Sequence, residues 1–309
     1  MSEYHIPVML KECIQGLEIN PNGIYVDLTF GGGGHSKEIL KHLDKGHLYA
    51  FDQDNDAIKN AEAIESKNFT FINANFRYLK KYLRFYNVKK VDGVLADLGV
   101  SSHQFDEESR GFSFRFDAEL DMRMDINEEL TAKTIVNEYE EANLHKIFGM
   151  YGEVKNARKL ANAIVSNRTN NEVNTINEFL EIIEPLAPKF REHKYFAQVF
   201  QALRIEVNRE MEVLEDMLMQ IPDVLAENGR LVVMSYHSLE DRMVKNLIQK
   251  GKIHGELEKD FYGNVLKPLN AVVRKIIIPT EEEIERNSRA RSAKLRLATR
   301  NESEWQGIQ

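Results

Sequence analysis

The chain has 309 residues, with 41 lysines and arginines against 49 aspartates and glutamates, so its formal net charge is −8 at pH 7. Hydrophobic residues make up 42% of the chain and charged residues 29%, which supports a buried core and excludes a wholly disordered protein. The single cysteine, Cys13, excludes an internal disulfide and a cysteine-rich zinc module. We see neither a signal peptide nor an apolar run long enough to span a membrane, and therefore expect a cytoplasmic location.

Short apolar runs alternate with helical patterns through the first hundred residues. The predicted strands are residues 24–28, 48–51, 69–72 and 91–96, and the segments between them repeat apolar residues at helical spacing. Strand–helix–strand alternation of this kind predicts a parallel sheet with helices packed against it.

The fifth predicted strand, residues 230–236, lies far along the chain and follows an amphipathic helix over 211–221. Asp97 and Arg230 are 133 residues apart, whereas a strand–helix–strand unit needs roughly 30. The intervening residues, about a hundred more than such a unit needs, show helical periodicity at 142–150, 157–165 and 176–183. We therefore expect an α/β core over residues 1–105 and 201–309, with a helical domain inserted over 106–200. Two more strands are predicted at 272–278 and 294–298.

Four consecutive glycines, residues 31–34, follow the first predicted strand and precede a helix. Without side chains, such a turn lets backbone N–H groups approach a ligand closely. Asp52 ends the second strand about 20 residues later, where an acidic group receives ribose hydroxyls. The combination predicts a nucleoside-cofactor site, and the alternative is a flexible turn beside a solvent-facing aspartate.

The spacing of the residues in this turn indicates which kind of cofactor it binds. A dinucleotide site needs G-x-G-x-x-G, and here His35, Ser36 and Lys37 follow the glycines. Asp27, just before the turn, suits a cation better than a pyrophosphate. S-adenosylmethionine, which has a ribose, an α-amino group and a sulfonium, fits these features better than NAD.

Asp97 ends the fourth predicted strand, at the edge where ligands of open α/β sheets bind. Ser101 and Ser102 follow it, and capping a helix explains them as well as a direct catalytic role does. After the fifth strand, Ser238 and Asp241 fit a capping box at a helix start, with His237 beside them.

Taken together, these motifs resemble the MraW/RsmH family of 16S ribosomal RNA cytosine-N4 methyltransferases. The resemblance spans nearly the whole chain, in order, and several of its motifs are peculiar to the family. The matching stretches are residues 5–10, 27–35, 51–54, 97–102, 110–114, 120–125, 200–204, 236–242 and 288–292. It implies a seven-stranded Rossmann-like fold that binds S-adenosylmethionine and carries an inserted helical domain.

Carried over by position, the family's cofactor contacts fall at the sheet edge and in the loop after the fourth strand. Those implied residues are Gly33, Gly34 and His35 for the methionine part, Asp52 for the ribose, Phe76 for the adenine, and Asp97 with Gln104 to complete the pocket. The chain departs from the family at His103, where proline is common, and at Gly32, where a larger residue is common.

The activity implied is methylation of the N4 amine of a cytidine in 16S rRNA of the small subunit, without a metal. That amine is a weak nucleophile, so the enzyme must orient it and accept hydrogen bonds from its N–H groups. We expect Asp97, or a backbone carbonyl of residues 98–101, to be the acceptor. An aromatic ring among Phe112, Phe114 and Phe116 is a candidate for stacking on the base, with a place in the core as the alternative.

An acidic protein that binds RNA must gather its cations locally. The candidate clusters are Arg77/Lys80/Lys81/Arg84, Lys189/Arg191/Lys194 and Arg286/Arg289/Arg291/Lys294/Arg296, and a homodimer is a further expected partner. Alternative functions are methylation of DNA or a small molecule, a nicotinamide-dependent oxidoreductase, and a non-catalytic RNA-binding assembly factor.

Overall fold

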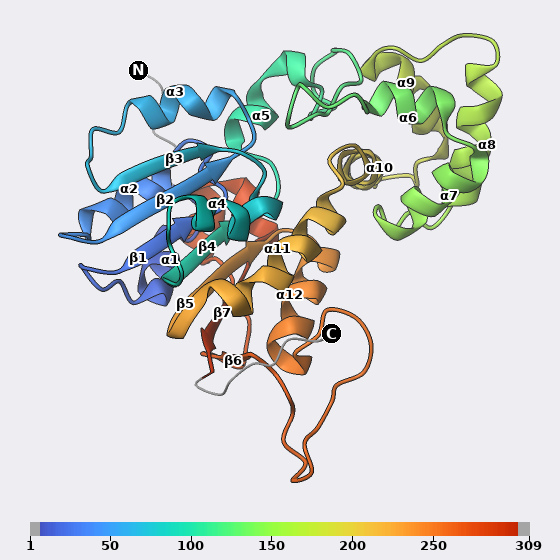
Figure 1. The fold of residues 1–309 in the computed structure, drawn as a ribbon. Helices are drawn as coiled ribbons and strands as arrows, with labels where there is room; N and C mark the ends of the chain where they lie inside the picture. The colour runs from blue at the N-terminus through green and yellow to red at the C-terminus, as the bar shows by residue number, and fades with distance from the viewer. Residues whose placement is uncertain (1–6, 302–309) are drawn as a thin grey trace. The chain divides into compact units, whose positions relative to one another are not determined.

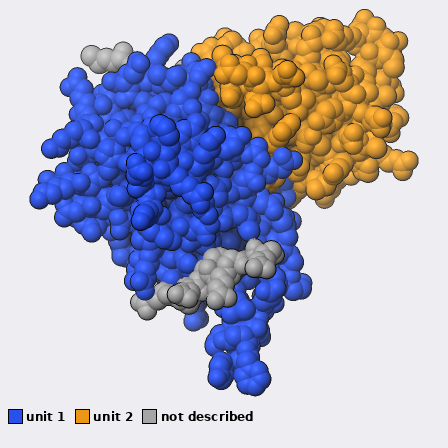
Figure 2. All heavy atoms as spheres, viewed as in Figure 1, with its two compact units in different colours: residues 1–99, 212–309 blue, residues 100–211 orange. Residues whose placement is uncertain are grey.

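A computed structural model describes residues 7–301, without the side chains of Ser102 and His103. The first two residues of the 5–10 motif therefore lie outside the described part. The chain divides into two compact units: unit 1 comprises residues 1–99 and 212–309, and unit 2 comprises residues 100–211 (Figure 2).

A seven-stranded sheet is the centre of unit 1 within the described residues, as the sequence predicted (Figure 1). The order is β3-β2-β1-β4-β5-β7-β6; β1 to β5 pair in parallel, and β7 is antiparallel to both β5 and β6. The strands are β1 Ile24–Asp27, β2 His47–Asp52, β3 Phe69–Asn73, β4 Val91–Asp97, β5 Leu225–Ser235, β6 Leu269–Ala271 and β7 Lys294–Arg300.

Helices connect and cover these strands, because each connection between parallel strands must cross back over the sheet. The helices of this part of the chain are α1 Leu10–Leu17, α2 Gly34–Lys41, α3 Asp56–Glu62, α4 Leu79–Phe85, α11 Glu210–Val224, α12 Ser238–Lys250 and α13 Glu281–Arg286. The core on one side joins α1 to the sheet: Cys13 and Leu17 pack with Leu95 of β4 and Val232 of β5.

Unit 2 has a hydrophobic core of its own, drawn from residues 112–207. Its helices are α5 Ser102–Asp106, α6 Ala132–Glu138, α7 Glu141–Met150, α8 Ala157–Arg168, α9 Ile176–Ile183 and α10 Glu192–Val207. The expected insert, 106–200, differs from unit 2 at both ends. Helix α10 runs unbroken past residue 200, and Leu203 and Val207 belong to this core, so the helix stays with unit 2 to its end.

The sixth strand differs from its prediction. Residues 272–278 were expected to form it, but β6 ends at Ala271. The later segment contributes a hydrogen bond from the Val272 N–H to the Leu297 carbonyl and an isolated bridge from Ile277 to Leu295. Val272, Val273 and Ile278 are exposed, so these β-branched residues lie on the surface rather than in a buried strand. Among the helices of residues 7–301, none has the length and apolar character needed to cross a membrane.

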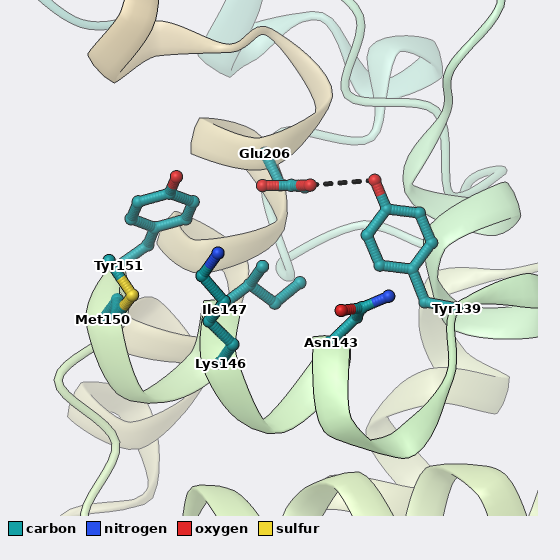
Figure 3. Close-up of a pocket in the computed structure, with 7 residues that line it drawn as sticks. All are labelled: Tyr139, Asn143, Lys146, Ile147, Met150, Tyr151 and Glu206. Carbon is teal, nitrogen blue, oxygen red and sulfur yellow. Dashed lines mark hydrogen bonds between the residues drawn. The ribbon is translucent and has the colours of Figure 1, made fainter.

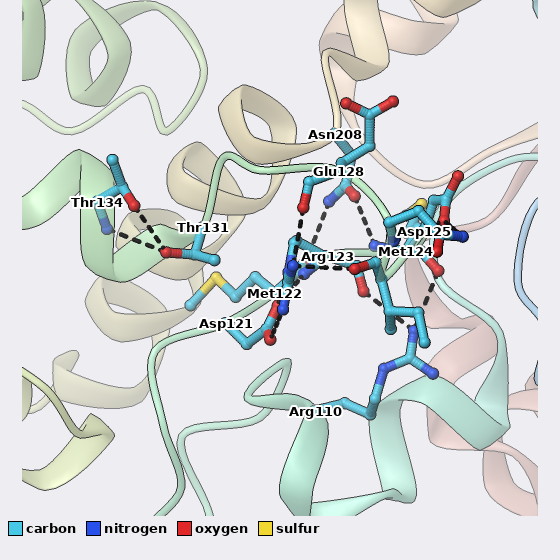
Figure 4. A network of polar contacts seen from close by, with 12 residues as sticks. Arg110, Asp121, Met122, Arg123, Met124, Asp125, Glu128, Thr131, Thr134 and Asn208 are labelled. Atoms are coloured by element: carbon cyan, nitrogen blue, oxygen red, sulfur yellow. Dashed lines mark hydrogen bonds and ion pairs between the residues drawn. The ribbon is translucent and has the colours of Figure 1, made fainter.

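A network of polar contacts holds the loop between α5 and α6 inside unit 2 (Figure 4). The Asn208 side chain accepts a hydrogen bond from the Met124 backbone N–H at 2.7 Å and donates to the Met122 carbonyl at 2.8 Å. Arg110 donates to the carbonyls of Arg123 and Met124. This loop contains the 110–114 and 120–125 motifs. Arg110 and residues 122–124 of these motifs therefore take part in the hydrogen bonds that hold the loop in unit 2.

Candidate active site

Three aspartates lie at the carboxyl ends of neighbouring parallel strands in unit 1, a place that we call the aspartate edge. Asp27, Asp52 and Asp97 are the last residues of β1, β2 and β4, which lie side by side and run parallel. Loss of surrounding water raises the pKa of each carboxyl to about 6. Since a nearby positive charge relieves that cost, the edge favours a cationic ligand.

The glycine turn faces this edge through its backbone. Gly31 has φ +51° and donates its N–H to Asp52 Oδ2 at 2.7 Å. Gly33 has φ +74°, and a Cβ there would lie 2.7 Å from Phe30 Cζ, while one on Gly34 would lie 2.2 Å from Pro7 Cγ. A Cβ on Gly32 would meet nothing within 4 Å. The turn thus requires glycine at its packed positions and leaves open space beside Gly32.

Asp27 is committed to holding the turn together. Its Oδ2 accepts a hydrogen bond from Ser36 Oγ at 2.7 Å, and its Oδ1 accepts one from the Thr29 N–H at 3.1 Å. These bonds tie the end of β1 to the first turn of α2. The carboxyl group therefore positions the glycine turn, besides adding negative charge to the edge.

Asp97 lies among three partners of unit 1. Tyr236 Oη donates to its Oδ1 at 2.8 Å, His35 Nδ1 lies 3.9 Å from its Oδ2, and its backbone N–H donates to Thr29 Oγ1 at 2.7 Å. Burial lowers the pKa of His35, so the imidazole is neutral at pH 7. Burial also raises the pKa of Tyr236 well above its usual value, so the phenol keeps its proton.

The sequence prediction missed Tyr236 as a site residue. A signal was present: Tyr236 directly follows β5, and β5 pairs with β4 so that Met234 lies opposite Asp97. Residues after two adjacent parallel strands meet at the same edge, which is the argument that had selected Asp97 itself.

Asp52 and Phe76 follow from two neighbouring strands: Asp52 is the last residue of β2, and Phe76 lies shortly after the end of β3. Asp52 accepts one hydrogen bond at each carboxylate oxygen, from the N–H groups of Gly31 and Asp54. Each oxygen has a second lone pair, so the group can still receive the two hydroxyls of a ribose. Phe76 begins a short 3-10 helix, Phe76–Tyr78, after β3 and is half-buried.

The remaining predicted site residues, Ser101, Ser102 and Gln104, belong to unit 2. Gln104 N–H donates to Ser101 Oγ at 3.1 Å, and Ser101 N–H donates to Gln104 Oε1 at 3.0 Å. This reciprocal pair caps the start of α5, which is the capping alternative for Ser101. The side chain of Ser102 lies outside the described part of the structure.

The capping box after β5 lies one residue earlier than expected. His237, rather than Ser238, is the N-cap of α12, and Glu240 completes the box. Asp241 instead forms a bidentate ion pair with Arg296 at 2.7 and 3.1 Å. The prediction that paired Ser238 with Asp241 was wrong, because Asp241 is held by this arginine of β7.

The candidate RNA-binding cations divide into paired and exposed groups. Arg77 and Lys80 form ion pairs with Asp216 and Asp223, so the first cluster is partly neutralised within unit 1. Lys189, Arg191 and Lys194 of unit 2 are exposed, as are Arg286 and Arg291 near the end of the chain. Of the three phenylalanines, Phe112 is a core residue, Phe114 packs on Phe196 and Phe200, and Phe116 is exposed.

A pocket of about 210 Å³ lies inside unit 2, between α7 and the end of α10 (Figure 3). Tyr139 Oη donates to Glu206 Oε1 at 2.8 Å across it, and Lys146 and Tyr151 also line it. The residues predicted for catalysis and cofactor binding are absent from its lining. The predicted residues therefore lie outside this pocket, and Asp52 and Asp97 are at the carboxyl ends of β2 and β4.

Comparison with known proteins adds independent findings. A model of the MraW methylase family matches residues 2–301. A ribosomal RNA small subunit methyltransferase H from Cytophaga hutchinsonii is 61% identical over 297 residues, which cover 96% of this chain and 99% of that protein. A protein of the same name from Christiangramia forsetii is 58% identical over 299 residues, covering 96% and 98%. The solved structure of an rRNA methylase from Streptococcus thermophilus aligns with 94% of this chain and 95% of its own at 13% identity, with a TM-score of 0.41.

Proposed function

Because the chain belongs to the MraW methylase family, as its motifs predicted, we propose that it transfers a methyl group from S-adenosylmethionine to the N4 amine of a specific cytidine in 16S rRNA. One observation carries this proposal. The family match runs through residues 2–301 and so includes the glycine turn, Asp52 and Asp97. The relatives that cover almost the whole chain are named for methylation of small-subunit ribosomal RNA.

The described residues fit S-adenosylmethionine. Gly33, Gly34 and His35 would hold the methionine part, Asp52 the ribose and Phe76 the adenine, with Asp97 beside them in unit 1. The open space beside Gly32 and three carboxyls of raised pKa suit a bulky, positively charged ligand. When bound, this cofactor supplies an electrophilic methyl group on its sulfonium.

Asp97 is the group we assign to the cytosine amine. Its carboxylate would accept a hydrogen bond from the amine N–H and stabilise the positive charge that develops on nitrogen. The phenol of Tyr236, 2.8 Å away, fixes the orientation of the carboxylate. A backbone carbonyl of residues 98–101 is the alternative acceptor, and Ser101 and Ser102 are assigned to shaping the same loop.

RNA binding is assigned to the cations that the structure leaves exposed. These are Lys189, Arg191 and Lys194 on unit 2, with Arg286 and Arg291 near the end of the chain. Phosphate contacts release counterions, so affinity for the RNA should fall steeply as salt rises. A homodimer remains a prediction.

The deciding experiment incubates the protein with a labelled methyl donor and small ribosomal subunits from a strain that lacks the gene. We expect the label on N4 of a single cytidine in the 16S rRNA. Label elsewhere would overturn the substrate assignment, and cofactor binding without any transfer would favour an assembly factor. In parallel, S-adenosylmethionine but not NAD should raise the thermal midpoint; the reverse would favour an oxidoreductase.

A further inference from the structure

Strand β1 turns away from its neighbour β4 before β4 has ended. The Leu28 N–H still donates to the Leu95 carbonyl of β4 at 2.9 Å. The chain then turns toward β2, where the Phe30 N–H donates to the Phe51 carbonyl at 2.9 Å. Within the described residues, the backbone N–H of Asp97, the last residue of β4, therefore has no backbone acceptor on β1.

The hydroxyl of Thr29 takes the place of that acceptor. Its Oγ1 accepts a hydrogen bond from the Asp97 N–H at 2.7 Å. A hydroxyl oxygen that accepts one bond can still donate its own proton, and Thr29 donates it to the carboxylate of Asp27. The Thr29 N–H also donates to Asp27 Oδ1, at 3.1 Å. This one residue thus binds the aspartates at the ends of both β1 and β4.

The same carboxylate continues the contact into the glycine turn. Ser36 Oγ, in the first turn of α2, donates to Asp27 Oδ2 at 2.7 Å, and both side chains are buried. A series of hydrogen bonds therefore runs from the backbone of Asp97 through Thr29 and Asp27 to the helix that follows the turn. Connected hydrogen bonds polarise and strengthen one another in a buried setting, so the series holds the end of β4 at a fixed place beside the turn.

We propose that Thr29 is a positioning residue for methyl transfer, whose hydroxyl fixes Asp97 in place relative to the glycine turn. The proposal rests on the proposed function, in which Asp97 accepts from the cytosine amine and the turn holds the methyl donor. Transfer requires the amine nitrogen to lie in line with the sulfonium methyl, and a misplacement of about 1 Å can cost roughly 100-fold in rate. Tyr236 orients the Asp97 carboxylate itself, whereas Thr29 fixes the backbone that carries it.

The kinetic test is Thr29→Val, which replaces the hydroxyl by a methyl group of similar shape. In methylation of small subunits, kcat and kcat/KM should fall together by about 10- to 100-fold, because the hydroxyl governs the geometry of transfer and not the binding of RNA. Thr29→Ser keeps the hydroxyl and should restore most of the turnover.

The matched control is Ser36→Ala, which also removes one hydroxyl from Asp27 but leaves the bond between Thr29 and Asp97. It should weaken the binding of S-adenosylmethionine at least as much as Thr29→Val does, with the smaller loss of kcat. Calorimetric binding of the cofactor and the thermal midpoint show that each variant is folded. Equal losses of kcat in Thr29→Val and Ser36→Ala would overturn the positioning role, because both variants would then act through Asp27 alone.

Amide hydrogen exchange followed by NMR reads the contact without any turnover. In Thr29→Val, the Asp97 N–H should exchange about 10-fold faster, since it loses its acceptor. The adjacent Leu98 N–H donates to the Met234 carbonyl at 2.9 Å and should keep its protection. Unchanged exchange at Asp97 would overturn the proposal. If the unaltered protein methylates no subunit, the proposed function fails instead, and the exchange still decides whether Thr29 holds Asp97.

Discussion

At the scale of single residues, the site is built around a carboxyl group whose ionised form has lost much of its water. Asp97 compensates for that loss with one phenol hydrogen bond from Tyr236, and the nearest ring nitrogen, on His35, is 3.9 Å away and uncharged. A carboxylate stabilised so sparingly gains more from a developing positive charge than one already paired with an arginine. This environment is the physical reason for assigning the cytosine amine to Asp97.

Asp97→Asn should lower kcat about 10²- to 10³-fold, because an amide offers no negative charge to the reacting amine. The variant keeps an oxygen that accepts from Tyr236, so unfolding free energy should change little. Single-turnover methylation of subunits measures the first expectation, and calorimetric binding of the cofactor checks that the pocket is intact. Near-normal turnover with normal cofactor affinity would remove Asp97 from the reaction. Tyr236→Phe, which leaves the carboxylate in place, should have the smaller effect.

The pKa values of Asp27, Asp52 and Asp97 predict a pH dependence. Each lies near 6 in the folded protein against about 3.9 in an unfolded chain, so the folded state holds extra protons between those values. These groups therefore favour folding most below about pH 4, and their contribution decreases as pH rises through 6.

A cationic ligand prefers the ionised carboxylates, so affinity for S-adenosylmethionine should increase as pH rises from 5 to 7, with release of protons on binding. Calorimetry in buffers of different ionisation enthalpy counts these protons. S-adenosylhomocysteine, which lacks the sulfonium charge, should show a weaker dependence, and Asp52→Asn should release fewer protons. An affinity that does not change over this range would contradict the assignment of these carboxyls to the cofactor site.

At the scale of elements, the glycine turn connects β1 to α2 and depends on positions that cannot carry a side chain. The ring of Phe30 lies under Gly33 and packs on Phe69 and Phe71, with centroids 5.8 and 5.2 Å away. A side chain on Gly33 therefore displaces the small aromatic cluster that supports the turn.

Gly33→Ala should lower the unfolding free energy by about 1–2 kcal/mol through its left-handed backbone alone. Gly32→Ala is the matched control, since a Cβ there meets nothing within 4 Å; its unfolding free energy should stay within about 0.5 kcal/mol of the parent. Thermal unfolding without ligand measures both. Equal stability of the two variants would show that the turn tolerates a side chain at either position.

Much of the sheet could be predicted from the sequence, because its strands are buried apolar runs bounded by glycine, aspartate and helical patterns. The prediction over 272–278 failed for an identifiable reason: apolar character alone does not separate a strand from an exposed β-branched segment such as Val272–Val273. The end of the insert was misjudged because the helical pattern of α10 carries no marker at residue 200.

The site was predictable where it follows from strand ends, and it was missed where it depends on a contact between distant elements. Asp52 and Asp97 were predicted from their positions at the ends of β2 and β4. Tyr236 is 139 residues from Asp97 in the chain, and only the pairing of β4 with β5 brings the phenol to the carboxylate. Similarly, no local pattern shows that Arg296 of β7 holds Asp241.

At the scale of the whole molecule, the chain contains two units with separate hydrophobic cores. The core of unit 2 draws on residues 112–207, and the core beneath α1 draws on both segments of unit 1. Separate cores permit separate unfolding transitions. S-adenosylmethionine bound at the aspartate edge should therefore stabilise unit 1 in particular.

Asn208→Ala tests this independence, because it removes the bonds from Met124 and to Met122 and Arg204 while lying within unit 2. We expect a loss of about 1–3 kcal/mol from unit 2. Hydrogen exchange should become faster over 100–211 and stay unchanged in β1, β2 and β4. If protection falls equally in both units, the molecule unfolds as a single cooperative body.

The place of the insertion also governs how the protein is made. Strand β4 has β1 on one side and β5 on the other, and Leu225, the first residue of β5, follows Asp97 by 128 residues. At about 5–20 residues per second, translation leaves that flank of β4 bare for roughly 6–25 s. Unit 2 can complete its core during this interval. A ribosome that stalls just before Leu225 would thus leave a finished helical unit tethered to a half-built sheet, whose exposed backbone invites aggregation with other nascent chains.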